Sequence, residues 1–127
     1  MTLASSDLMS RTGFEACVLG LPGVTLVRQW GDASVAKVGG KIFAILSGWG
    51  TGGEAGLSFK CSELSFAMLP ELPQVRPAPY LARAKWVQVL PGAPLSQEEL
   101  AAYVRQAHQL VAARLTRRLR AELGLGL

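Results

Sequence analysis

Two strand-like runs separated by a pair of glycines constrain the fold of this chain more than any other feature. Ala33–Val38 and Lys41–Ser47 are rich in apolar and β-branched residues, and Gly39-Gly40 lies between them. Glycine adopts positive φ without steric cost, so two adjacent glycines suit the type I′ turn of a tight β-hairpin. The predicted cross-strand pairs are Lys37 with Ile42 and Ala36 with Phe43.

The segments around this hairpin indicate a larger α+β domain. Further strands are expected at Thr25–Trp30, Leu57–Cys61 and Lys85–Leu90. Helices are expected at Ser6–Leu19, Ser62–Leu69 and Gln97–Arg120, the last behind a Ser-x-x-Glu capping box and about 36 Å long. The predicted order is α-β-β-β-β-α-β-α, in two layers, with an antiparallel sheet covered on one face by helices. A length of 127 residues predicts a single domain, 1–127.

Composition and the N-terminal segment exclude several classes of protein. Half of the residues are hydrophobic, which is enough for a core without disulfides or a structural metal. The two cysteines, Cys17 and Cys61, form no disulfide framework and are expected to be buried thiols in a reducing compartment. The N-terminus lacks a basic region and a long apolar core, and no apolar run approaches the roughly 20 residues of a membrane span. We therefore expect a soluble, cytoplasmic protein with no membrane partner.

One long stretch of the chain is basic and contains no acid. Leu72–Gln97 carries Arg76, Arg83, Lys85 and the indole of Trp86, with prolines at 73, 77 and 79 that prevent a helix in its first half. The whole chain has a net charge of +4, and nine of its 13 bases are arginines. A surface of this composition favours an anionic partner, of which nucleic acid is the commonest.

Basic and aromatic residues on or near the predicted strands form the candidate nucleic-acid site. Its members are Lys37, Lys60, Arg76, Arg83 and Lys85 as phosphate contacts, with Trp30 and Trp86 as stacking residues. The alternative is that the tryptophans belong to the core and the lysines to a solvated sheet face. Arg114, Arg117 and Arg118, on one face of the closing helix, either grip phosphate or compensate the helix dipole.

Catalytic and metal sites have little support in the sequence. The single histidine, His108, has no carboxylate one helical turn away, and there is no Cys-x-x-Cys motif or carboxylate cluster. We predict no metal, no cofactor and no catalytic residue. The Gly-rich segment Gly48–Gly56 is expected to be a hairpin loop and not a phosphate loop, because a strand follows it where a phosphate loop needs a helix. Whether Trp49 within it is buried stays open.

The ordered motifs of the chain resemble the MmcQ/YjbR family. The resemblance rests on LPGV after the first helix, WGDASVAKVGGKIFAIL, LSFKCSEL, VRPAPYLARAKWV and the closing LSQEEL, and spans about Phe14 to Arg118. It implies a CyaY-like α+β fold and DNA binding through β-hairpins. Family-typical residues stand at Trp30, Lys37, Phe43, Lys60, Arg76, Pro77, Arg83 and Trp86. The tyrosine usual in the family is replaced here by His108. The iron binding of other CyaY-like proteins is not expected, because the first helix has only Asp7 and Glu15 as acids.

Three hypotheses for the function follow. The first is a non-enzymatic DNA-binding domain that contacts phosphates through the basic and aromatic sheet surface. The second is an adaptor or chaperone-like module that binds a protein partner, through the hairpin edge or the proline-rich segment. The third is a small-molecule or enzymatic site that combines Arg76, Tyr80, Trp86 and His108. The sequence favours the first.

Overall fold

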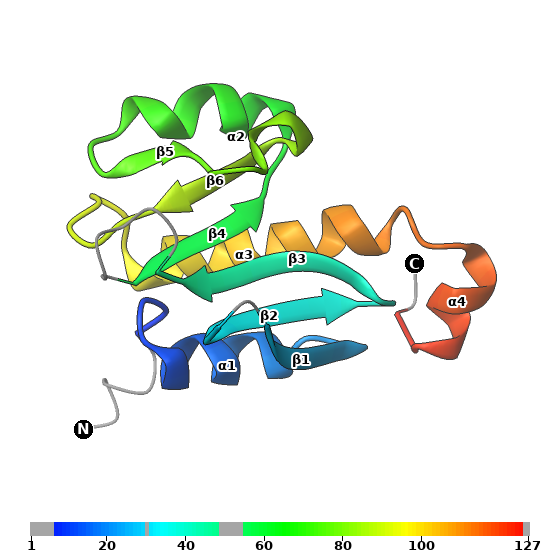
Figure 1. Ribbon diagram of the computed structural model, residues 1–127. Coiled ribbons are helices and arrows are strands. Elements are labelled where there is room, and N and C mark those ends of the chain that lie inside the picture. Colours follow the sequence, from blue (N-terminus) through cyan, green and yellow to red (C-terminus); the bar gives the residue numbers. More distant parts are fainter. Residues whose placement is uncertain (1–6, 30, 49–54, 126–127) are drawn as a thin grey trace.

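The protein folds around one six-stranded antiparallel sheet (Figure 1). The computed structural model describes residues 7–29, 31–48 and 55–125. The strands are β1 (Val24–Gln29), β2 (Ala33–Val38), β3 (Lys41–Ser47), β4 (Gly56–Lys60), β5 (Val75–Pro77) and β6 (Trp86–Val89), in the spatial order β1-β2-β3-β4-β6-β5. The helices are α1 (Arg11–Leu19), α2 (Glu63–Met68), α3 (Gln97–Ala112) and α4 (Arg117–Glu122), with short 3-10 turns η2 (Leu69–Glu71) and η3 (Ala82–Ala84). The predicted α+β class is confirmed.

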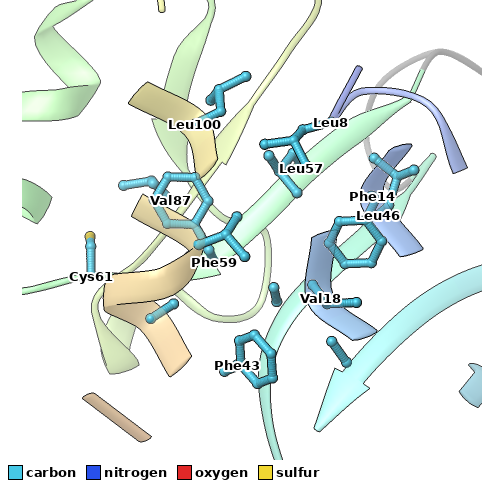
Figure 2. Packing of buried hydrophobic residues seen from close by; sticks show 14 of the residues in the cluster. Leu8, Phe14, Val18, Phe43, Leu46, Leu57, Phe59, Cys61, Val87 and Leu100 are labelled. Atoms are coloured by element: carbon cyan, nitrogen blue, oxygen red, sulfur yellow. The ribbon is translucent and has the colours of Figure 1, made fainter. Parts of the chain in front are cut away.

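The helices α1 and α3 pack on the same face of the sheet, as expected. Phe14 and Val18 of α1, Val104 of α3, and Phe59 of β4 are each 0% exposed and belong to one apolar cluster, much of which Figure 2 shows. Burying such side chains supplies about 1.5–3 kcal/mol each, so this layer holds the fold together. No helix in the described ranges is both long and apolar enough to cross a bilayer.

The β2–β3 hairpin forms with one change of register. Lys37 pairs with Ile42 as predicted, but Ala36 pairs with Ala44 and not with Phe43. Phe43 is the extra residue of a β-bulge, which lets it and Ala44 both join the main core although they are adjacent in sequence. The expected Ala36–Phe43 pair was wrong because a strict alternation would turn one of these two buried residues away from the helices.

The strand β5 was not predicted. It contains only three residues, Val75–Pro77, and forms the sheet edge beside β6. Pro77 is tolerated there because an edge strand need not donate every backbone hydrogen bond. The segment after β5 then crosses the second face of the sheet, where Ala78 and Leu81 pack with Trp86.

The predicted closing helix is two helices. α3 ends at Ala112, and α4 starts after Thr116, whose hydroxyl accepts a hydrogen bond from the Leu119 amide at 3.1 Å. The break allows Leu115, 7% exposed, to pack at the β2–β3 turn, where a Cβ on Gly39 would lie 2.6 Å from its Cδ1. The predicted uninterrupted helix was wrong because a local cap and a buried leucine outweigh helix continuity.

Two shorter predictions also need correction. α1 begins at Arg11, because Ser10 caps it by accepting from the Gly13 amide; the expected start at Ser6 was too early. On α2, Leu64 and Met68 were predicted to face inward but are 69% and 55% exposed. The six-residue α2 packs through Phe66 instead, so only one narrow side of it meets the core.

Candidate functional site

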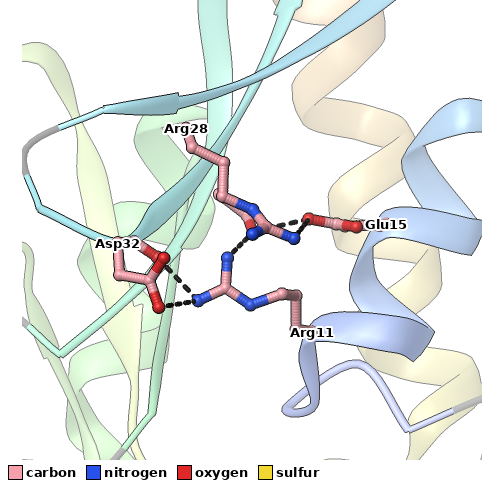
Figure 3. Close-up of polar contacts among 5 residues, drawn as sticks. Arg11, Glu15, Arg28 and Asp32 are labelled. Carbon is pink, nitrogen blue, oxygen red and sulfur yellow. Dashed lines mark hydrogen bonds and ion pairs between the residues drawn. The ribbon is translucent and has the colours of Figure 1, made fainter.

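Several bases are already engaged in holding the fold. Arg11 donates to Asp32 Oδ2 at 2.7 Å and to Ser34 Oγ at 3.1 Å, and Ser34 donates to Glu15 Oε2 at 2.8 Å (Figure 3). Arg28 lies 3.4 Å from the same Glu15 oxygen. These contacts fasten α1 to β1 and β2, so Arg11 and Arg28 have structural partners.

Two arginines of α4 are engaged in the same way. Arg118 pairs with Glu122 one helical turn later, at 3.3 Å. Arg120 donates to the Ala113 carbonyl at 2.9 Å and so satisfies a backbone acceptor just beyond the last turn of α3. The predicted grouping of Arg114, Arg117 and Arg118 on one helix face is wrong, because Arg114 lies in the connection before α4.

Five of the remaining nine bases gather at one end of the sheet, where β4 ends and β3 and β6 begin (Figure 1). Two hollows lie side by side there, of about 370 Å³ and 420 Å³, and share Lys60, Ala84 and Arg114 in their walls. The first hollow is also lined by Arg83 and Lys85, and the second by Lys41. We call these five residues, Lys41, Lys60, Arg83, Lys85 and Arg114, the cationic cluster.

The cationic cluster has little compensating negative charge. Glu63 is the acid in the wall of the first hollow, and no acid lines the second among the described residues. No ion pair within residues 7–29, 31–48 and 55–125 includes any of the five cations. Like charges held close together without counterions create a positive potential that attracts anions.

Lys60 lies at the centre of the cluster. Its ammonium donates to the Ala84 carbonyl at 2.7 Å, which fixes the side chain between the two hollows. Burial lowers the pKa of Lys60, and the positive charge of Arg114 lowers it further; Cys61 acts in the opposite direction, and Lys85 adds the smallest lowering effect. A bound anion would relieve this repulsion and favour the charged amine.

The loop before β6 holds Lys85 in place. Lys85 adopts a left-handed backbone conformation, with φ of 66°, at the end of η3. Its carbonyl accepts from the Cys61 amide at 3.0 Å and from Cys61 Sγ at 3.4 Å, and its ammonium lies 5.1 Å from the centre of the Phe66 ring. This cation–π contact, together with the hydrogen bonds from Cys61 directly after β4, holds the charge of Lys85 in the wall of the first hollow.

Cys61 brings no thiolate chemistry to this site at neutral pH. The residue is 2% exposed, and burial raises the pKa of its thiol to about 11 although Lys60 acts in the opposite direction. A neutral, buried thiol is a poor nucleophile and a poor metal ligand. Elsewhere in the described chain, no group of three potential ligands from His, Cys, Asp and Glu could hold a metal ion.

The sequence matches the model of the YjbR family over residues 19–110. The chain belongs to the YjbR family. No curated protein matches it. A solved structure of a Deinococcus radiodurans protein, described as having a DUF419 domain, is 23% identical and superposes with a TM-score of 0.74 over 88% of this chain and 86% of that one. A Pseudomonas syringae protein is 20% identical, with a TM-score of 0.66 over 80% and 97% of the two chains. These likenesses establish the YjbR-type fold.

The structure brings together three of the predicted site residues of this YjbR-family protein. Lys60, Arg83 and Lys85 line the first hollow. Lys41 was not among the predicted site residues, because it looked like a hairpin residue. Arg114 was considered as a phosphate contact only together with Arg117 and Arg118, with compensation of the helix dipole as the alternative. The signal that could have found them is a lack of nearby acids, but this becomes visible only when the fold is known.

The other predicted bases lie elsewhere on the YjbR fold. Lys37 is on β2, two strands away from β4, and is half-buried. Arg76 is on the edge strand β5, where its Nε and one terminal nitrogen donate to Gln88 Oε1 at 2.8 Å and 2.6 Å. Neither lines the two hollows, so the predicted single patch divides into separate groups.

Trp86 is the one predicted stacking residue within the described part of the chain, and it is largely buried. Trp86 is 5% exposed and belongs to a second apolar cluster with Val35 and Ile45, on the face of the sheet opposite the main core. Trp86 lines the second hollow, but at 5% exposed it offers very little ring surface to a nucleic-acid base, which agrees with the alternative that it is a core residue. Trp30 and Trp49 lie outside the described residues.

His108 does not share a site with Arg76. It is 5% exposed, its Nε2 lies 2.8 Å from the Pro22 carbonyl oxygen, and its ring meets Phe43 edge-on at 5.3 Å between centroids. These contacts place it on the helix-covered side of the sheet, whereas Arg76 meets Gln88 on the other side. The geometry gives no support to a combined Arg76–His108 site.

Proposed function

We propose that this YjbR-family protein is a non-enzymatic DNA-binding protein that holds phosphates in its cationic cluster. The observation that carries the proposal is the meeting of five cations from separate segments around two adjoining hollows, with Glu63 as the acid in their walls. Phosphate oxygens are strong acceptors for lysine and arginine donors, and release of counterions from DNA favours such contacts.

The character of the site also indicates what is recognised. Phosphate contacts position a nucleic acid but do not read its sequence, which is done by contacts with base edges. The cluster contains lysines and arginines, and the nearby Trp86 is buried. Binding through this site is therefore expected to depend on charge and to discriminate weakly between sequences.

The proposal is tested by DNA binding of four proteins as a function of salt: wild type, Lys60→Gln, Arg114→Gln and the double variant. The DNA is a fluorescently labelled oligonucleotide, and its fluorescence anisotropy gives the dissociation constant. We expect the steepness of the negative slope of log K against log salt to decrease by about 0.7–0.9 for each phosphate contact that is removed. This decrease should be the same for oligonucleotides of different base sequence. Arg105→Gln is the matched control, since Arg105 is an exposed arginine of α3 that lines neither hollow.

Thermal unfolding of each variant shows whether it is folded, which matters because Lys60 also bonds to Ala84. Wild-type affinity that is independent of salt, or equal losses in Arg105→Gln and Arg114→Gln, would contradict the assignment of DNA binding to this cluster.

A protein partner is the second candidate, and the exposed side of α2 favours it. Leu64 and Met68 lie one helical turn apart, 69% and 55% exposed, and such apolar neighbours mark many interaction surfaces. If this surface binds a protein, a Leu64→Ser/Met68→Ser variant should lose a partner that wild type retains after nuclease treatment. A partner held equally by both proteins would exclude this side of α2.

A further inference from the structure

The first hollow has the size of a site for one small group. Its volume of about 370 Å³ lies in the range of about 300–1,000 Å³ found for small-ligand pockets. Four cations line it, Lys60, Arg83, Lys85 and Arg114. A duplex backbone spreads its charges along an extended surface, at one per roughly 1.7 Å of helix axis, whereas this hollow concentrates positive charge in one place.

We infer that the first hollow binds the terminal phosphate of a phosphorylated nucleic-acid strand, a phosphomonoester, in preference to an internal phosphodiester. The inference rests on the proposed function and names its ligand group. A phosphodiester has one negative charge and two free oxygens, whereas a phosphomonoester carries a charge of about −1.5 to −2 and presents three acceptor oxygens. The more highly charged group matches four convergent cations better.

The donors around the hollow suit such a group. Lys60 uses one of its three N–H donors on the Ala84 carbonyl, which leaves two for a ligand. Arg83 and Arg114 are exposed, and each guanidinium offers a planar fork that fits two phosphate oxygens. Lys85 is held at the rim by Phe66. Glu63 also lies in the wall and repels an anion, but it is one acid against four bases.

The second hollow explains why a strand, and not a free phosphate, is the expected ligand. It adjoins the first through Lys60 and Arg114 and adds Lys41 beside the apolar side chains of Ile42 and Leu115. A nucleotide chain whose end is held in the first hollow can continue into the second, where Lys41 would meet the next phosphate. Inorganic phosphate alone would make none of these added contacts.

The test compares one single-stranded oligonucleotide in three forms, with a 5′-phosphate, a 3′-phosphate or no terminal phosphate, by isothermal titration at constant salt. We expect one of the phosphorylated forms to bind about tenfold more tightly than the unphosphorylated form, because it adds a charge-assisted contact. This preference should fall to about onefold in Arg83→Gln and Arg114→Gln and persist in Arg105→Gln.

The outcomes separate this inference from the proposed function. Equal binding of the three forms, with salt-dependent DNA binding retained, overturns the terminal-phosphate inference and leaves the DNA-binding proposal in place. Binding of a nucleoside monophosphate that Arg114→Gln abolishes, with no binding of any oligonucleotide, supports a phosphomonoester site and overturns DNA as its source. Inorganic phosphate that competes as well as the phosphorylated oligonucleotide would contradict the role of the second hollow.

Discussion

At the residue scale, Lys60 and Cys61 show how one environment acts on two neighbours in opposite directions. Burial disfavours the charged form of each side chain, so it lowers the pKa of the Lys60 amine and raises that of the Cys61 thiol to about 11. The amine is then sensitive to an arriving anion, while the thiol stays protonated. The Cys61 thiol therefore supplies no thiolate to this site at neutral pH.

This difference predicts how Cys61 reacts. At pH 8 a thiol with a pKa of about 11 is about 0.1% thiolate, so alkylation by iodoacetamide should be on the order of 100-fold slower in the folded protein than in the unfolded one. The rate should then rise about tenfold per pH unit as the pH approaches 11. Mass spectrometry of the peptide that contains Cys61 measures the alkylation rate of this thiol separately from that of Cys17. Equal rates for the folded and unfolded protein at pH 8 would contradict the burial of this thiol.

The same shift has a consequence for stability. Folding raises the pKa of Cys61 from its ordinary value of 9.0 to about 11, so the folded state binds the proton more tightly. The contribution of the thiol to stability is therefore complete below about pH 9 and is lost as the pH rises through 11. Lys60 contributes in the opposite direction, because its pKa is lowered on folding.

At the scale of elements, the sequence predicts best where the signal is local. The β2–β3 hairpin has its predicted bounds because Gly39 and Gly40 both adopt positive φ, 59° and 80°, as a type I′ turn requires. The cap at Ser96 was equally visible. The bulge at Phe43 and the break before Thr116 were not, because both depend on which side chains the tertiary core takes in.

Gly13 of α1 lies against the backbone of Asp7, and this close contact predicts a stability change opposite to the one expected from helix propensity. A Cβ on Gly13 would lie 2.0 Å from the Asp7 carbonyl oxygen, so alanine cannot fit without a shift of the backbone. Gly13→Ala should destabilise the protein by about 1–3 kcal/mol, although alanine normally stabilises a helix relative to glycine. Urea unfolding measures the change in the free energy of unfolding.

Gly20→Ala is the matched control for this substitution. Gly20 has φ of −78°, and a Cβ there would lie 3.5 Å from the Cys17 carbonyl oxygen, an ordinary contact. We expect a change within about 0.5 kcal/mol. A Gly13→Ala protein as stable as wild type would show that α1 does not approach Asp7 as closely as described.

At the scale of the whole molecule, the candidate site is a product of topology. Lys41, Lys60 and Lys85 are far apart in sequence and meet because the antiparallel order places the start of β3, the end of β4 and the start of β6 at the same end of the sheet. Arg114, in the connection after α3, lines the same hollows. The acid-free stretch predicted Arg83 and Lys85 as site residues, and both line the first hollow. It could not distinguish them from Arg76, because only strand order shows that β5 carries Arg76 to the outer edge.

The exposure of the tryptophans was equally beyond the sequence. An indole at a strand end suits either a core or a stacking surface, and Trp86 is buried because the segment with Ala78 and Leu81 covers that face of the sheet. With that ring largely buried, the proposed DNA binding depends on phosphate contacts alone. We propose that the nucleic acid lies on the cationic cluster.

Amide chemical-shift mapping by NMR tests this claim most directly. A 5′- or 3′-phosphorylated single strand is titrated into the isotope-labelled protein at low salt, with Arg114→Gln as the comparison. We predict that the shifted amides cluster at residues 60–63, 83–86 and 110–115, and that the shifts shrink in the variant. Shifts centred on Lys37 or Arg76, with the cluster unaffected, would contradict it.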